Sequence, residues 1–191
     1  MDTLKIGCIV MAAGNARRFG SNKLLAEVAG QPLIARALQA VPVEKLSCVQ
    51  VVTQYPAVSA IAAEHGFYVV ENAHPELGLS HTIALGLQAL PPVDTALFMV
   101  ADQPYLQKES VAKLINFYLQ APDMIATVGH EGVHGNPCLF PARFFPELQA
   151  LQGDRGGAAV IRSHPESLRI LEVDALQLQD VDTPQQLETL A

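Results

Sequence analysis

The stretch that decides the fold runs Ile6-Gly7-Cys8-Ile9-Val10-Met11-Ala12-Ala13-Gly14-Asn15-Ala16-Arg17-Arg18-Phe19-Gly20-Ser21-Asn22-Lys23. Its first six residues form an apolar run that predicts a buried strand, and the small residues that follow predict a loop. Ala12, Ala13 and Gly14 leave almost no side chain between the backbone N–H groups and a ligand, so an anion can approach the main chain. Arg18 and Lys23 supply positive charge beside them. The stretch therefore predicts a strand that ends in a binding loop for a triphosphate.

The rest of the chain repeats the alternation of strand and helix. Apolar runs of strand length recur, and segments with helical periodicity lie between them. Thr183 and Gln186 have the spacing of a capping box, and Pro184 suits a first helical position. The pattern indicates an α/β fold with a mainly parallel sheet. The predicted strands are 6–11, 48–53, 68–71, 96–100, 124–128, a short strand at 139–140 after a glycine-rich turn or hairpin, and 168–173, and the predicted helices are 32–41, 58–65, 80–90, 108–120, 144–151, 157–163 and a closing helix after residue 184.

Length and charge limit the classes of protein and partner. A chain of 191 residues can bury one sizeable core but is too short for two ordinary domains, so we expect a single domain over 1–191. The formal net charge of −7 gives no general attraction for nucleic acid or for an anionic membrane surface, and neither is expected as a partner. An anionic ligand must therefore be held by the local positive charge of Arg17, Arg18 and Lys23.

The cysteines and the N-terminal sequence indicate a cytoplasmic protein. Cys8, Cys48 and Cys138 lie far apart without metal-ligand spacing, which favours free thiols in a reducing compartment. Neither a signal-peptide pattern nor an apolar run long enough to span a bilayer is present in the sequence. The six histidines contain no HExxH pair, and no Gly-x-Ser-x-Gly elbow occurs, so neither a zinc site nor a serine hydrolase is expected.

Two familiar classes of glycine-rich loop do not match. A Walker loop needs Gly-Lys followed by Ser or Thr, whereas Lys23 follows Asn22 and precedes Leu24. A dinucleotide fingerprint needs an acidic residue at the end of the second strand, where this chain has Thr53-Gln54. A loop suited to folding over a nucleoside triphosphate remains, and the alternative is a turn that merely lets strand and helix pack.

Asp102 is the strongest single candidate after the loop. It follows the predicted strand 96–100 at the carboxyl end, where open α/β sheets collect their ligands. Magnesium on a triphosphate is a natural partner for this carboxylate, because that hard ion takes oxygen ligands and keeps phosphates and waters in its shell. The alternative is that Asp102 only initiates the turn at Gln103-Pro104. Ser80 is a candidate N-cap for the predicted helix 80–90, because a serine hydroxyl can accept a hydrogen bond from a backbone N–H at a helix start.

Several blocks, taken in order, resemble the nucleotidyltransferases that act on molybdenum cofactor. The resemblance implies a Rossmann-like three-layer nucleotidyltransferase fold with a mostly parallel sheet. It implies transfer of a nucleoside monophosphate to molybdopterin or molybdenum cofactor with release of pyrophosphate, Mg²⁺ as cofactor, and a recipient molybdoenzyme as a further partner. Ala13 stands where guanylyl-transferring relatives typically have glycine, which favours CTP as the donor. The blocks are the loop with Arg18, Gly20 and Lys23; Gly78-Leu79-Ser80-His81-Thr82 with Leu85; Ala101-Asp102-Gln103-Pro104; Gly135-Asn136-Pro137 with Phe140; Gly153-Asp154-Arg155-Gly156-Gly157-Ala158; and Asp180-Val181-Asp182-Thr183-Pro184.

The candidate site combines both lines of reasoning. Lys23, Arg18 and Asp102 are the expected catalytic residues, and the resemblance assigns the metal to Asp102 and Asp182, with Asp180 in reserve. We expect residues 1–106 to bind the nucleotide and residues 107–191 to bind the acceptor, with Arg155 meeting its phosphate. The expected nucleotide contacts are Ala12, Ala13, Gly14, Arg18, Gly20, Lys23, Gly78, Ser80 and Thr82.

Departures from the family pattern keep other functions open. Ala16 replaces a serine common in the family, and Ala101 replaces a glycine that often precedes the acidic ligand. The alternatives are a transferase that uses GTP or a sugar or polyol phosphate, and a non-catalytic accessory protein that carries nucleotide or cofactor to a molybdoenzyme. A Rossmann oxidoreductase is disfavoured by the missing acidic residue near Thr53.

Overall fold

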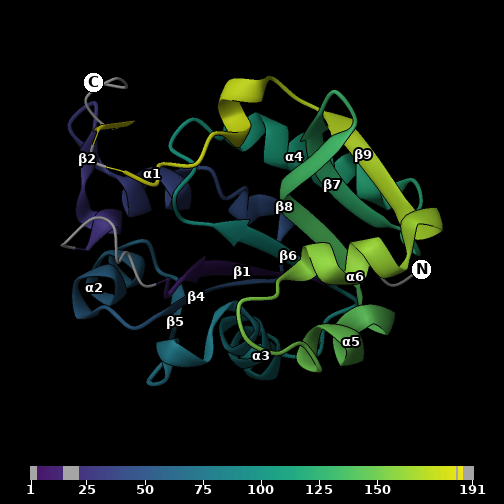
Figure 1. Ribbon diagram of the computed structural model, residues 1–191, viewed down its shortest axis with the longest axis horizontal. Helices are drawn as coiled ribbons and strands as arrows, with labels where there is room; N and C mark the ends of the chain where they lie inside the picture. The colour runs from purple at the N-terminus through teal and green to yellow at the C-terminus, as the bar shows by residue number, and fades with distance from the viewer. Residues whose placement is uncertain (1–3, 15–21, 184, 187–191) are drawn as a thin grey trace.

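A seven-stranded sheet forms the centre of the computed structural model, which describes residues 4–14, 22–183 and 185–186 (Figure 1). The strand order is β5-β4-β1-β6-β8-β7-β9. All neighbouring pairs are parallel except those of β8, which runs antiparallel to both β6 and β7. The strands are β1 (Ile6–Ala12), β4 (Cys48–Thr53), β5 (Tyr68–Glu71), β6 (Thr95–Val100), β7 (Ile125–His130), β8 (Val133–Pro141) and β9 (Leu168–Glu172).

Helices cover both faces of this sheet. Both faces carry apolar side chains that must be buried: on β1, Cys8 and Val10 point into one apolar core and Ile9 points into another. Helices α1 (Leu33–Gln39), α2 (Pro56–Glu64) and α4 (Lys108–Leu119) pack in the first core. Helices α3 (Leu79–Ala89), α5 (Phe145–Gln149) and α6 (Gly157–Ser163) pack in the second, and Figure 1 shows α3 and α5 below β1 and α4 above it. The predicted three-layer α/β fold is confirmed.

Short elements complete the chain. A two-stranded ribbon of β2 (Glu27–Val28) and β3 (Gln31–Pro32) precedes α1. Within the described residues, short 3₁₀ turns connect the larger elements: η1 (Lys23–Leu25), η2 (Val43–Lys45), η3 (Pro75–Leu77), η4 (Ala142–Phe144), η5 (Pro165–Ser167) and η6 (Ala175–Leu178).

Strand β8 corrects one prediction. The short strand expected around Leu139 and Phe140 is part of a nine-residue strand that begins at Val133. The glycine-rich segment is strand because its first residues pair with β7, whereas β6 pairs only with residues 138–141, and Pro137 is accommodated where the β7 ladder has an irregular register. The preceding turn is a tight hairpin, in which Glu131 and Gly132 both have positive φ, at 50° and 77°.

The start of the predicted closing helix is confirmed, although most of that helix lies outside the described residues. Thr183 N–H donates to Gln186 Oε1 at 2.9 Å, and Gln186 N–H donates to Thr183 Oγ1 at 3.4 Å. These reciprocal bonds are a capping box. The three cysteines are free, as expected, and burial raises the pKa of Cys138 to about 12. Among the helices of the described residues, none has the length and apolar character needed to cross a bilayer.

Candidate active site

A cleft of about 470 Å³ opens at the carboxyl ends of β1 and β6. This is the edge at which parallel sheets bind their ligands. Three segments form most of its wall: the loop after β1, the loop after β6, and the segment from η3 into α3. The described residues that line it are Met11, Ala12, Ala13, Gly14, Asn22, Lys23, Leu24, Pro75, Glu76, Gly78, Leu79, Thr82, Val100, Ala101, Asp102 and Asp154.

Lys23 joins the two predicted metal-binding carboxylates. Its Nζ donates to Asp102 Oδ2 at 2.7 Å and to Asp182 Oδ1 at 3.2 Å. Lys23 is the first residue of η1, which Asn22 caps by accepting Leu24 N–H at Oδ1 at 3.1 Å. The side chain of Lys23 is 16% exposed, that of Asp102 24% and that of Asp182 58%. The cluster therefore extends from the partly buried floor of the cleft to solvent.

Asp182 reaches Lys23 because the preceding segment is bound to the loop after β6. Val181 N–H donates to Asp102 O at 3.0 Å, and Gln103 Nε2 donates to Leu178 O at 3.3 Å. The side chain of Val181 is fully buried in a small apolar cluster with Val28. These contacts bring together two carboxylates that lie far apart in the sequence.

The acidic surroundings shift two pKa values. Burial alone would lower the pKa of Lys23, but the charges and hydrogen bonds of Asp102 and Asp182 outweigh it, so the pKa is raised. Burial and then the charge of Asp102 raise the pKa of Asp180 to about 6. Lys23 is therefore an ammonium ion throughout the neutral range.

Gly78 brings the start of α3 against the turn at Gly153. Its φ of +87° and ψ of −172° belong to a region that is essentially restricted to glycine. A Cβ on this residue would lie 2.5 Å from the carbonyl carbon of Gly153. Ser80 N–H donates to Gly153 O at 3.0 Å, which holds the two segments together. This contact carries Asp154 to the rim of the cleft.

The prediction that Ser80 caps α3 was wrong. The N-cap residue is Gly78, and no side chain makes a capping hydrogen bond there. Ser80 is already helical and only 5% exposed, and it is not among the described residues that line the cleft. Thr82 does line the cleft, where its Oγ1 accepts a hydrogen bond from Asn72 Nδ2 at 3.1 Å.

The structure brings most of the other predicted site residues together. Arg18 and Gly20 lie outside the described residues, as do Ala16 and Arg17. Asp182 is joined to the other predicted site residues by its hydrogen bond with Lys23. The predicted residues that line the cleft are Ala12, Ala13, Gly14, Lys23, Gly78, Thr82 and Asp102.

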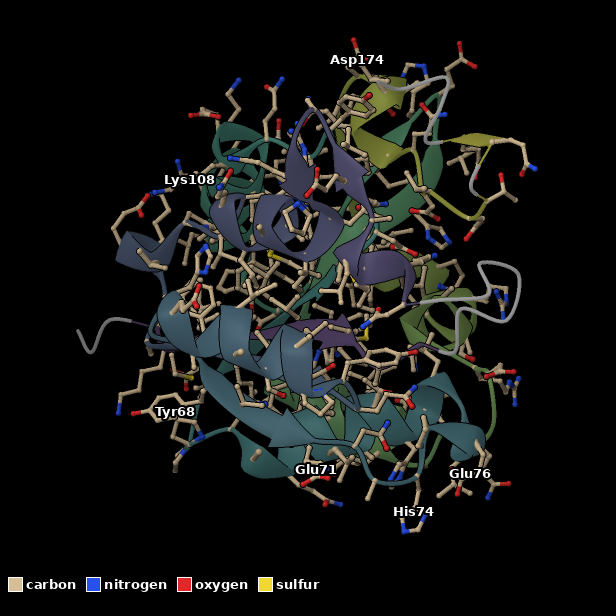
Figure 2. All side chains as sticks on the ribbon, turned by 90° about the vertical axis from the view of Figure 1, so that its left-hand side faces the viewer. Tyr68, Glu71, His74, Glu76, Lys108 and Asp174 are labelled. Carbon is tan, nitrogen blue, oxygen red and sulfur yellow. The ribbon has the colours of Figure 1, made fainter. Side chains whose placement is uncertain are left out.

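Sequence reasoning missed residues on two sides of the cleft. Glu76 and Asp154 line it, and Glu76 accepts a hydrogen bond from His74 at 3.1 Å in an exposed pair (Figure 2). On the other side, the side chains of residues 53–55 donate to the carbonyl groups of residues 12–14, at the end of β1 and the start of the loop after it. The polar residues 53–55 at the end of β4 were the available sequence signal for these contacts. The signal could be interpreted only once β4 was known to lie beside β1.

A second cavity of about 340 Å³ adjoins the cleft and shares Met11, Leu79, Val100 and Asp154 with it. Its interior is largely apolar, with Phe98 and Phe140 from β6 and β8. Gly135, Asn136, Gly156 and Gly157, from the blocks that we expected to meet the acceptor, also line it. Arg155 is exposed, and it is not one of the described residues that line this cavity.

Comparison with known proteins places this arrangement in a family. The MobA-like NTP transferase domain matches residues 8–168. Purine catabolism protein PucB of Bacillus subtilis (strain 168) is 27% identical over 195 residues, covering 94% of this chain and 93% of PucB. The 3-deoxy-manno-octulosonate cytidylyltransferase of Neisseria gonorrhoeae is 26% identical over 111 residues, covering 57% of this chain and 44% of that protein.

Solved structures share the fold of this chain. Rv0371c from Mycobacterium tuberculosis H37Rv superposes with a TM-score of 0.82 and 24% identity, covering 100% of this chain and 98% of that chain. A second structure of Rv0371c, in complex with manganese, gives a TM-score of 0.79 and 23% identity, with 97% of each chain covered. The predicted Rossmann-like nucleotidyltransferase fold and the family resemblance are confirmed. The chain belongs to the MobA-like NTP transferase domain family and is a nucleotidyltransferase.

Proposed function

We propose that this protein transfers CMP from CTP to the terminal phosphate of molybdopterin or its molybdenum form, in a magnesium-dependent reaction that releases pyrophosphate. The observation that carries the proposal is the position of Lys23 Nζ, 2.7 Å from Asp102 and 3.2 Å from Asp182 in a cleft beside the glycine-containing loop. This arrangement combines a cation for phosphate oxygens with carboxylates for a metal. The choice of CTP is supported by Ala13 and by the similarity to a cytidylyltransferase.

The residues of the cluster suit Mg²⁺. One oxygen of Asp102 and one of Asp182 both contact Lys23 Nζ, so the two carboxylates lie close enough to bind one cation together. The described residues contain no group of three or more His, Cys, Asp or Glu side chains able to hold a metal ion. Two carboxylates that share the ion with substrate phosphates and water are a usual donor set for Mg²⁺. Asp102 and Asp182 would hold it, and it would neutralise charge on the triphosphate when bound.

In this reaction the main tasks of the protein are to position the two substrates and to stabilise the charge on their phosphates. An oxygen of the acceptor phosphate attacks the α-phosphorus in line, and the bond from that phosphorus to the bridging oxygen breaks. Pyrophosphate leaves with the electron pair of that bond. A phosphate acceptor is already ionised near neutral pH, so no general base is required. Lys23, whose ammonium form is stabilised by its neighbours, would offset the charge that develops on the phosphates.

The second cavity offers a place for the acceptor. It joins the cleft at Met11, Leu79, Val100 and Asp154, so a molecule bound there would have an end near the triphosphate. Its largely apolar interior suits a flat ring system, and the glycines at 135, 156 and 157 leave backbone groups accessible.

The experiment is pyrophosphate release from CTP, GTP, ATP and UTP with magnesium, with and without molybdenum cofactor. We expect release that depends on the acceptor and is fastest with CTP, and we expect Asp102→Asn to abolish it. Asp123→Asn is the matched control, because Asp123 is exposed and precedes β7 at the opposite end of the sheet. No release from any nucleotide, or an Asp102→Asn rate equal to that of Asp123→Asn, would contradict the proposal. Release with GTP alone would correct the donor.

A further inference from the structure

Three consecutive side chains, from the last residue of β4 and the two that follow it, hold three consecutive carbonyl groups, from the last residue of β1 and the first two of the loop after it. Thr53 Oγ1 donates to Ala12 O at 2.9 Å, Gln54 Nε2 donates to Ala13 O at 2.8 Å, and the Tyr55 hydroxyl donates to Gly14 O at 2.9 Å. We call these three side chains the loop clamp. The clamp exists because β4 and β1 are parallel neighbours with Thr53 opposite Ala12, so both strands end at the same level.

The clamp determines which way the peptide groups of the loop face. In a trans peptide the C=O of one residue and the N–H of the next point in opposite directions. Because the carbonyls of Ala12 and Ala13 point toward the clamp, the N–H groups of Ala13 and Gly14 point away from it. Ala12, Ala13 and Gly14 line the cleft, whereas none of the described residues 53–55 does. The two N–H groups therefore face the cleft.

The clamp is itself rigidly held. Thr53 is 1% exposed, and its Oγ1 accepts the N–H of Tyr55 at 3.1 Å while donating to the loop. The ring of Tyr55 is partly buried and packs against the apolar core. A backbone dipole that is fixed before the ligand arrives needs no reorganisation when an anion binds.

We infer that the loop clamp is a set of positioning residues for the nucleoside triphosphate, because it aims the N–H groups of Ala13 and Gly14 at the cleft. The inference rests on the proposed function, in that the ligand of this cleft is a nucleotide. It goes beyond it by assigning a role to Gln54 and Tyr55, which contact the loop from behind.

Tyr55→Phe and Gln54→Glu test the clamp. The first removes only the hydroxyl that donates to Gly14, and the second replaces a donor by an ionised carboxylate that cannot donate to Ala13. Tyr68→Phe is the matched control, because Tyr68 is 74% exposed on the edge strand β5, where Figure 2 shows its side chain at the surface. For each variant we would measure the dissociation constant of the magnesium nucleotide that the wild type binds most tightly, the acceptor KM and the thermal midpoint.

We expect Tyr55→Phe to weaken nucleotide binding by about two- to tenfold, the effect of one lost hydrogen bond, with the acceptor KM and the midpoint unchanged. Gln54→Glu should weaken it further, and Tyr68→Phe should change none of the three. An unchanged dissociation constant in both clamp variants overturns the inference, as does an equal loss of nucleotide and acceptor binding with a lower midpoint. Because the dissociation constant is measured without acceptor, it tests the clamp even if no transfer to molybdopterin is found.

Discussion

Replacing Gly78 by alanine should destabilise the fold and displace the turn that carries Asp154. The backbone of Gly78 has φ +87° and ψ −172°, which costs a residue with a side chain about 1–3 kcal/mol. The added Cβ would also lie 2.5 Å from Gly153 C and 2.6 Å from Gly153 O. Those atoms are backbone and cannot rotate away, so overpacking adds about 1–3 kcal/mol. We therefore expect the free energy of unfolding to fall by about 2–6 kcal/mol in Gly78→Ala.

Equilibrium unfolding in urea measures this loss, and Gly132→Ala separates its two causes. Gly132 also has a positive φ, 77°, but a Cβ there would meet no atom within 4 Å. Its substitution should cost only the conformational term, about 1–2 kcal/mol. If Gly78→Ala loses no more stability than Gly132→Ala, the close approach of α3 to the turn at Gly153 does not constrain the fold, and the reasoning fails. Nucleotide binding should weaken in Gly78→Ala and remain unchanged in Gly132→Ala.

Two further predictions concern groups with altered pKa values. Because the pKa of Asp180 is raised to about 6, the folded protein binds this proton more tightly than the unfolded chain does. The free energy of unfolding of the metal-free protein should therefore fall as the pH rises from about 4 to about 6, by about 1–2 kcal/mol once solvent screening is allowed for. Asp180→Asn should remove that part of the fall, and parallel pH profiles of the two proteins in urea unfolding would refute it. Burial raises the pKa of Tyr118, whose hydroxyl lies 2.6 Å from both Thr95 Oγ1 and Pro122 O. Tyr118→Phe should cost about 1–2 kcal/mol in the same assay, and a loss below about 0.5 kcal/mol would show that these bonds add little.

Local sequence pattern was enough to predict the larger helices and most of the strands of the main sheet. The apolar run at 6–11 is β1 because both faces of a central parallel strand are buried, so its sequence is continuously apolar. The capping box at Thr183 could be predicted because both partners lie within one helical turn. Asp102 could be placed at the ligand edge because it directly follows a buried strand.

The predictions that failed depended on contacts between distant parts of the chain. Ser80 has the right chemistry for a cap, but the turn at Gly153 occupies the space before α3 and requires glycine at 78. The Gly-rich segment before Leu139 has weak strand propensity, and its pairing with β7 makes it a strand. The hydrogen bonds of Gln54 and Tyr55 depend on strand order, which no local pattern encodes.

The late position of Asp182 in the chain has a consequence for synthesis. Lys23 and Asp102 are made before Asp182, which follows Asp102 by 80 residues. At about 5–20 residues per second, the ribosome needs about 4–16 s to add that interval. A nascent chain can therefore carry the binding loop and the first carboxylate, but it gains the second only when residues 178–182 dock on the loop after β6. Completion of the candidate active site is thus coupled to the synthesis of residues 178–182, so we expect a product that stops before this segment to carry the glycine-containing loop without Asp182 and to lack transferase activity.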